Sequence, residues 1–169
     1  GEPLFKRGWR AEKGEAPLKE NLAAGLLMLA GWTPEVPLLD PFCGSGTIAI
    51  EAALMAADRA PGLNRRFAFE RLAGFDAAAW QELKSQAAAA IDDSVPARIA
   101  GTDISSLVVD TARGNAQLAG LQNWLDDGRL SFAAGDARQS LPIAAGGMIV
   151  ANPPYGEQSA PKSATVPAL

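Results

Sequence analysis

The chain has 169 residues, of which 48% are hydrophobic and 20% are charged, and its formal net charge is −4. These values are typical of one globular domain, and no apolar run reaches the roughly 18 residues that span a bilayer. With no histidine and a single cysteine, Cys43, the sequence excludes an intrachain disulfide and disfavours a zinc site or a histidine-based triad. No basic, apolar leader opens the sequence, so we expect a cytoplasmic protein without a membrane partner.

The acidic net charge argues against nucleic-acid binding over the whole surface, because phosphates are neutralised by clustered lysine and arginine. Two basic stretches stand out from the average, residues 6–19 and residues 59–71. Solvated surface arginines are the simplest interpretation of both stretches.

The first predicted helix covers residues 17–30, beginning at Pro17 and ending at Gly31. Its leucines recur at helical spacing and predict one buried face: Leu18, Leu22, Leu26 and Leu29. A short apolar run, residues 37–40, then predicts a strand that enters a glycine loop. Residues 46–57 are apolar on nearly every side, which predicts a buried helix.

Residues 58–75 lack a clean period and are interpreted as a surface connection. Asp76 is a suitable cap for a helix that extends to Ile91. One apolar stripe is expected along that helix: Trp80, Leu83, Ala87 and Ile91.

Residues 97–103 predict a second strand that ends in an acid. Ser105 can then cap a helix with Gly120 just past its end. The apolar positions of that helix are Leu107, Val108, Ala112 and Ala116.

Two further strands are predicted, over residues 129–133 and 148–150. Strands that alternate with helices predict an α/β fold with a parallel sheet, right-handed crossovers and helices on both faces. Ligands of such sheets bind beyond the carboxyl ends of the strands. Each predicted strand is followed or ended there by a polar residue: Asp40, Asp103, Asp136 and Asn152.

The segment Asp40-Pro41-Phe42-Cys43-Gly44-Ser45-Gly46-Thr47 carries the most information. Its glycines allow a tight turn from strand to helix and let a ligand approach main-chain N–H groups. The segment from Gly44 to Ala49 also fits the Gly-x-Gly-x-x-Gly/Ala pattern of dinucleotide folds, which is a weak signal by itself. A tight turn without a ligand is the alternative interpretation.

The positions of the acids separate two cofactors. A nicotinamide enzyme places its ribose-binding acid about 20 residues after the glycines, whereas Asp103 is 57 positions past Gly46 (103 − 46). Asp40 precedes the glycines, where a carboxylate would repel a pyrophosphate but could bind a cationic amino-acid group. S-adenosylmethionine, which has such a group, an adenosine and no phosphate, fits better.

Asp136 follows the third strand and could accept a hydrogen bond from an adenine amino group. Any one of these acids is more simply a helix cap or turn residue. Three acids at successive strand ends favour a shared site.

The stretch Asn152-Pro153-Pro154-Tyr155 suits methylation of a planar amine. The Asn152 side-chain carbonyl and the Pro153 backbone carbonyl could accept from the amine and free its lone pair. Two prolines make the segment rigid, and Tyr155 offers a face for stacking a base. A rigid turn that ends a strand is the alternative. Cys43, inside the loop, is interpreted as a packing residue.

These motifs resemble the large-subunit (23S) ribosomal RNA guanine-N2 methyltransferases, many of which carry a THUMP RNA-binding domain. The resemblance rests on the glycine-loop segment, on Ala60-Pro61-Gly62-Leu63, on Asn-Pro-Pro-Tyr-Gly-Glu and on Arg7-Gly8-Trp9-Arg10. It implies a Rossmann-like class I fold, S-adenosylmethionine as cofactor and ribosomal RNA as substrate. By that resemblance, Asn152, Pro153, Pro154 and Tyr155 hold the target base, and the helix from Pro17 forms one wall of the cofactor pocket. The implied cofactor residues are Asp40, Pro41, Phe42, Cys43, Gly44, Ser45, Gly46, Thr47, Asp103, Ile104, Asp136, Ala137 and Asn152.

The chain departs from the family pattern in lacking a THUMP domain and in ending after four strands, where the family's sheet has seven. We therefore expect both missing parts in a longer parent chain, with residues 1–36 as linker and flanking helix, 37–157 as the first half of the core and 158–169 as a loop or tail. Adenine-N6 DNA methyltransferases and glutamine-N5 protein methyltransferases share the Asn-Pro-Pro-Tyr motif and remain alternatives. A non-catalytic nucleotide-binding module is a third.

Overall fold

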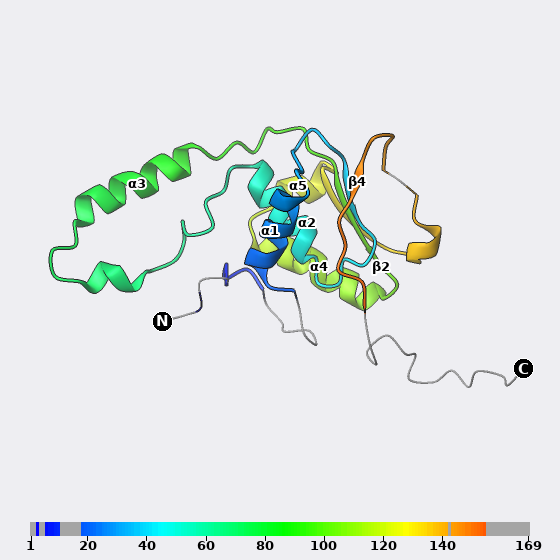
Figure 1. The fold of residues 1–169 in the computed structure, drawn as a ribbon, viewed down its shortest axis with the longest axis horizontal. Coiled ribbons are helices and arrows are strands. Elements are labelled where there is room, and N and C mark those ends of the chain that lie inside the picture. The colour runs from blue at the N-terminus through cyan, green and yellow to red at the C-terminus, as the bar shows by residue number, and fades with distance from the viewer. Residues whose placement is uncertain (1–2, 4–5, 11–17, 142, 155–169) are drawn as a thin grey trace, which may run out of the picture.

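The computed structural model describes residue 3 and residues 6–10, 18–141 and 143–154, and its strands form one parallel sheet (Figure 1). The strands are β1 (Leu38–Asp40), β2 (Ile99–Asp103), β3 (Leu130–Ala134) and β4 (Met148–Ile149), in the order β3-β2-β1-β4. The predicted parallel α/β fold is confirmed. The predicted tail, residues 158–169, lies outside the described residues.

Strand β1 is the point at which the order of strands reverses. Leu39 is in register with Ala100 of β2 on one side and with Ile149 of β4 on the other. The chain therefore extends the sheet first through β2 and β3 and then returns to add β4. A crevice for ligands forms beyond the strand ends at such a reversal, here between β1 and β4.

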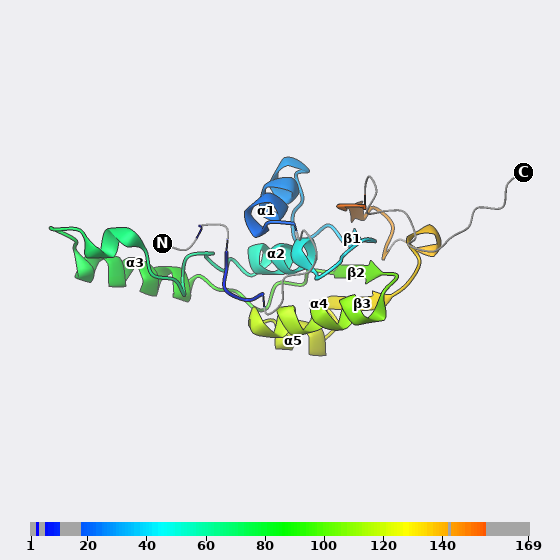
Figure 2. The ribbon, with the colours of Figure 1, turned by 90° about the horizontal axis from the view of Figure 1, so that it is seen from below.

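Four helices pack near the sheet: α1 (Glu20–Leu29), α2 (Thr47–Ala56), α4 (Ser106–Leu118) and α5 (Gln122–Asp126). Figure 2 shows α1, α2 and α4 stacked in that order. The prediction of a buried helix after the glycine loop is confirmed, because α2 is buried along most of its length. No helix in the described ranges is long and apolar enough to cross a bilayer. The short helix α5 was not predicted from the sequence.

The predicted buried face of α1 was wrong. The side chains that α1 buries are Glu20, Ala23 and Leu27, whereas Leu22 is 51% exposed and Leu29 is 88% exposed. The reason is the alanine-rich surface of α2, against which α1 packs. Small residues let the two helices approach closely. The face of α1 with Ala23 and Leu27 therefore packs on the core, and the face with the leucine stripe does not.

Helix α3 (Ala77–Ala89) stands away from the rest of the molecule (Figures 1 and 2). Asp76 caps it as predicted, accepting a hydrogen bond from the Ala79 N–H at 2.9 Å. The predicted apolar stripe does not face the core, since α3 has no buried residue and Leu83 is 55% exposed. Trp80 instead contacts the rings of Phe67 and Phe69, at 5.7 and 5.0 Å between centroids.

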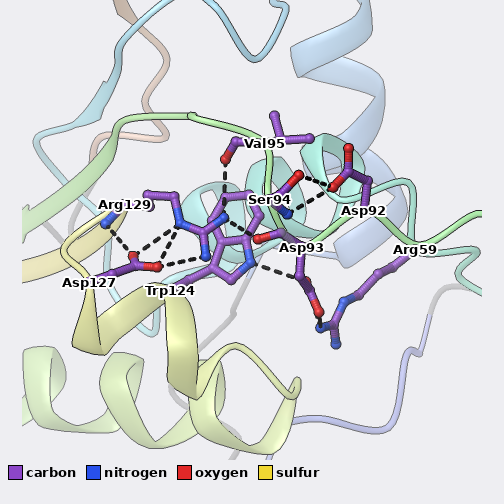
Figure 3. A network of polar contacts seen from close by, with 8 residues as sticks. All are labelled: Arg59, Asp92, Asp93, Ser94, Val95, Trp124, Asp127 and Arg129. Atoms are coloured by element: carbon purple, nitrogen blue, oxygen red, sulfur yellow. Dashed lines mark hydrogen bonds and ion pairs between the residues drawn. The ribbon is translucent and has the colours of Figure 1, made fainter.

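A polar network lies at the base of the projecting segment, which is the stretch of residues 60–92 that carries α3 (Figure 3). Arg59 binds both carboxylate oxygens of Asp93, at 2.9 and 2.8 Å, and Trp124 of α5 donates to the same carboxylate at 3.2 Å. Arg129 bonds the backbone carbonyl of Val95 at 3.1 Å and lies 4.3 Å from the centre of the Trp124 ring. The two ends of the segment are thereby fixed to each other and to α5.

Candidate active site at the carboxyl edge of the sheet

The strand order places the predicted site residues along one edge of the sheet. Asp40 and Asp103 are the last residues of the neighbouring strands β1 and β2. Asp136 follows β3 and Asn152 follows β4, so their order along the edge is Asp136, Asp103, Asp40, Asn152. Neighbouring strands lie about 4.8 Å apart. The four residues therefore form a row along the edge, with Asp40 next to the reversal point.

The glycine loop is fixed by backbone hydrogen bonds. Cys43 N–H donates to the Thr102 carbonyl of β2 at 2.9 Å, and Gly46 N–H donates to the Cys43 carbonyl at 2.8 Å. Gly46 has φ +88°, and a β-carbon there would lie 3.0 Å from the Ala112 β-carbon of α4. Gly46 is thus required both by its left-handed backbone and by the close approach of α4.

Cys43 is a packing residue. Its side chain is buried, and a β-carbon on Gly101 of β2 would lie only 2.8 Å from the Cys43 β-carbon. Burial raises the pKa of the Cys43 thiol, and the carboxylates of Asp40 and Asp103 raise it further. A thiol held in its neutral form is a poor nucleophile, which argues against cysteine-dependent methyl transfer.

Asp40 is buried, with 2% of its surface exposed, and its Oδ1 accepts from the Phe42 N–H at 3.1 Å. Burial raises the pKa of Asp40 to about 7, the hydrogen bond from Phe42 opposes this, and the negative charge of Asp103 adds to it. A cationic group placed beside this carboxyl would favour its ionised form. The Asp40 carboxyl at the end of β1 is therefore expected to ionise when a cationic group binds beside it.

Asp103 joins the end of β2 to the glycine loop. Its Oδ2 accepts from the Gly44 N–H at 3.1 Å, and its Oδ1 accepts from the Ser105 N–H at 3.0 Å. Ser105 caps α4 as predicted, accepting from the Val108 N–H at 3.4 Å. The next residue, Ile104, is 79% exposed and offers an apolar surface at the same edge.

Asp136 is engaged by its own neighbour. Its carboxylate accepts from the Arg138 Nε at 3.0 Å and from the Arg138 N–H at 2.9 Å. The hydrogen bond from the Arg138 side chain, followed by that from its backbone, lowers the pKa of Asp136 to about 2. Ala137 begins the short helical turn η2 (Ala137–Gln139) that Asp136 caps.

Asn152, Pro153 and Pro154 are exposed just past β4. Val150 N–H donates to the Leu39 carbonyl at 3.1 Å, so pairing with β1 continues to within two residues of Asn152. Asn152 is thereby held beside the strand that ends in Asp40. Tyr155 lies outside the described residues.

The sequence reasoning missed two arginines beneath the loop. The basic stretch 6–19 was interpreted as solvated, which is wrong for Arg7 and Arg10, whose side chains are only 14% and 11% exposed. Arg10 donates to the Thr47 hydroxyl at 2.8 Å, and Arg7 contacts Glu51 of α2 at 3.3 Å. The buried Trp9 between them in the sequence is the signal that residues 7–10 pack on the core.

Two hollows of the described chain lie away from the strand ends. One of about 270 Å³ opens between α1 and α2 beside Arg7, and one of about 290 Å³ lies beside Arg113 and Ser131. Neither is lined by Asp40, Asp103 or Asn152. The general rule for parallel sheets and the convergence of polar strand ends both favour the carboxyl edge as the ligand site.

The parallel sheet, the glycine loop after β1 and the acids after the strands define a Rossmann-like fold of the methyltransferase class. Residues 7–167 match the family described as RMKL-like, methyltransferase domain, and the chain belongs to that family. The resemblance seen in the sequence motifs is confirmed at this level.

Curated relatives are described as methyltransferases and are much longer than this chain. The chain is 48% identical over 163 residues to the ribosomal RNA large subunit methyltransferase K/L of Shewanella sp. (strain ANA-3) and 47% identical to that of Shewanella baltica (strain OS185). Each match covers 94% of this chain and 22% of the relative. The chain thus spans about a fifth of the length of these relatives.

Solved structures share the fold closely. SMU.472, solved in complex with SAH, superposes with a TM-score of 0.83 at 37% identity, covering 94% of this chain and 40% of that one. A protein of Listeria monocytogenes str. 4b F2365, described as a predicted N6-adenine-specific DNA methylase, superposes with a TM-score of 0.81 at 39% identity, covering 91% and 39%.

Proposed function

We propose that the full-length protein transfers a methyl group from S-adenosylmethionine to the exocyclic N2 amine of a guanine in large-subunit ribosomal RNA. The observation that carries the proposal is the alignment of Asp103, Asp40 and Asn152 on adjacent strands of one sheet edge. The RNA substrate is supported by the names of the Shewanella relatives. With ribosomal RNA as its substrate, the protein would act in the cytoplasm.

The residues at the edge suit S-adenosylmethionine from one end to the other. Asp103 would accept from the ribose hydroxyls, exchanging its contact with the Gly44 N–H. Asp40 would face the cationic methionine end, where a positive charge favours its ionised form. The SAH bound to SMU.472 supports a cofactor of this kind.

Asp136 would accept from the adenine amino group only by giving up its contact with Arg138. That exchange is inexpensive, since the Arg138 side chain is 86% exposed and ion pairs of exposed side chains contribute little stability. Ala137 and the exposed Ile104 would then flank the adenine ring.

S-adenosylmethionine supplies an electrophilic methyl group on a sulfonium. Asn152 and the Pro153 carbonyl would accept hydrogen bonds from the target amine, so that the nitrogen lone pair is directed at the methyl carbon instead of into the ring. In the proposed transfer the N–C bond would form as the C–S bond breaks, the sulfur would keep the electron pair of that bond, and the methylated amine would release its proton to water. Because the amine becomes acidic only during transfer, the residues at this edge need not include a strong general base.

Adenine-N6 methylation is the second candidate. The similarity to the Listeria monocytogenes protein favours it, because that protein is described as a predicted N6-adenine-specific DNA methylase. The acceptor pair at Asn152 and Pro153 serves either amine equally well. Only the product separates the two.

The proposal is tested by incubating the full-length protein with methyl-labelled S-adenosylmethionine and, in parallel, with ribosomal RNA, duplex DNA and a peptide release factor. We expect label in ribosomal RNA alone. Label in DNA would support the adenine alternative, and label in the release factor would indicate a glutamine methyltransferase. If none of the three substrates is labelled although the protein binds S-adenosylmethionine, the result would indicate a non-catalytic module.

A further inference from the structure

One guanidinium joins the N-terminal segment to the first turns of two helices. Arg10 Nη2 donates to the Leu18 carbonyl at 3.0 Å and to the Thr47 hydroxyl at 2.8 Å. Its Nε lies 3.5 Å from the carboxylate of Glu20. Glu20 begins α1 and Thr47 begins α2, so Arg10 holds both helix starts together.

These groups are buried. The side chain of Arg10 is 11% exposed and that of Glu20 is 6% exposed, while Thr47 as a residue is 4% exposed. A charge buried to this extent must keep its partners, which therefore fix one another's positions. The planar fork of arginine reaches several acceptors in set directions, which the single ammonium of lysine does not do.

Thr47 directly follows the glycine turn. Gly46 is the N-cap residue of α2, has a left-handed backbone and makes no side-chain capping bond. The first helical hydrogen bond runs from the Ile50 N–H to the Gly46 carbonyl at 2.9 Å. The orientation of the loop from Cys43 to Gly46 therefore depends on how the first turn of α2 is held, and Arg10 is the charged group that holds Thr47.

We infer that Arg10 is a positioning residue of the cofactor loop: by binding the Thr47 hydroxyl it sets the glycine turn in the orientation that receives the methionine end of S-adenosylmethionine. This inference rests on the proposed function and adds to it a residue that contacts no reacting atom. It also gives a role to the buried contacts of residues 7–10, which are distant in sequence from the loop.

Arg7 provides a matched control from the same segment. It contacts Glu51 through Nε and Nη2, both at 3.3 Å, and Glu51 is four residues beyond Thr47 on α2. Arg10→Lys and Arg7→Lys should both lower the melting temperature of the full-length protein. We expect Arg10→Lys to raise the dissociation constant of S-adenosylmethionine about tenfold, as for a lost hydrogen bond to a charged group, and Arg7→Lys to change it less than about twofold.

A second pair of variants removes the dependence on how well Arg10→Lys folds. Thr47→Val removes the hydroxyl and should weaken cofactor binding, whereas Thr47→Ser keeps the hydroxyl and should retain it. Combining Thr47→Val with Arg10→Lys should weaken binding no more than the stronger single change, because both break one contact.

Equal effects of the Arg7 and Arg10 variants on cofactor affinity would overturn the inference, as would fully additive effects of Arg10→Lys and Thr47→Val. Failure of the wild-type protein to bind S-adenosylmethionine would instead count against the proposed function. Calorimetry of binding and thermal unfolding, measured on the same samples, separate these outcomes.

Discussion

Asp103 at the end of β2 accepts a hydrogen bond from the backbone N–H of Gly44, in the loop that follows β1, at 3.1 Å. The second bond of the same carboxylate goes to the Ser105 N–H at the start of α4. The Asp103 side chain thus connects the end of β2 to the loop that follows β1, at the edge where we place the cofactor. Its role in binding can be separated from its role in folding.

Asp103→Ala should weaken binding of S-adenosylmethionine on the order of 10- to 100-fold, because the carboxylate that we propose accepts from both ribose hydroxyls would be lost. Calorimetric titration measures the change. Asp110→Ala is the matched control, since Asp110 is an exposed acid of α4 that pairs with Arg113. Unchanged affinity in Asp103→Ala would place the ribose elsewhere.

Asp40 should make the stability of the cofactor-free protein depend on pH. Its folded pKa of about 7 lies above the ordinary value of 3.8. A carboxyl with a raised folded pKa stabilises the fold fully below its unfolded pKa, and this contribution is lost as pH rises through about 7. Asp40→Asn removes the titration.

The stability of Asp40→Asn relative to wild type should therefore increase as pH rises from about 4 to about 8. Thermal unfolding of both proteins across this range measures the difference. A constant difference would show that Asp40 does not titrate in this window.

Asn152→Ala should abolish most transfer while leaving cofactor affinity nearly unchanged. Loss of a preorganised acceptor at the reacting amine typically lowers kcat about 10²- to 10³-fold. Asn123→Ala, at an exposed asparagine of α5, is the control and should leave both quantities as in wild type. Parallel loss of cofactor binding and transfer in Asn152→Ala would mean that Asn152 is structural.

Two glycine-to-alanine changes should have opposite signs. Gly46→Ala forces a β-carbon to within 3.0 Å of the Ala112 β-carbon at φ +88°, and should destabilise the protein by at least about 1 to 2 kcal/mol. Gly114→Ala in α4 meets nothing within 4 Å and should stabilise by up to about 1 kcal/mol. Chemical denaturation distinguishes them, and a neutral Gly46→Ala would contradict the packing described for the loop.

The network at the base of the projecting segment should respond to one aspartate and not to its neighbour. Asp93→Ala removes the partner of Arg59 and Trp124 and should cost about 1 to 2 kcal/mol, since the Asp93 side chain is 38% exposed and its ion pair is partly screened. Among the contacts described, the hydrogen bonds of the Asp92 side chain are to Ser94 in its own turn, so Asp92→Ala should cost less. Equal losses of unfolding free energy would show that the network does not stabilise the fold.

The strands could be predicted because the pattern that marks each strand lies within a few consecutive residues. Each strand is a short apolar run followed by a polar residue, and the glycine loop and the caps Asp76 and Ser105 have distinctive local chemistry. Boundaries shifted by a residue or two, as with β3, which begins at Leu130 and not at Arg129. The candidate site residues at the strand ends were predicted from the same signals.

What could not be predicted depends on contacts between distant residues. The buried face of α1 was set by the alanines of α2, which a leucine stripe does not reveal. Arg7 and Arg10 look like surface charges until Glu20, Thr47 and Glu51 are placed opposite them. The exposed position of α3 could not be predicted either. Its apolar stripe predicts a helix packed on the core, whereas α3 has no buried residue.

The most direct test of the central claim is the identity of the methylated nucleoside. Ribosomal RNA that has been treated with the full-length protein and S-adenosylmethionine is digested to nucleosides and analysed by mass spectrometry, with the Asn152→Ala protein in parallel. We predict N2-methylguanosine with the wild-type protein and little or none with the variant. N6-methyladenosine, or N2-methylguanosine formed equally by Asn152→Ala, would contradict the assignment of Asn152 to a guanine amine.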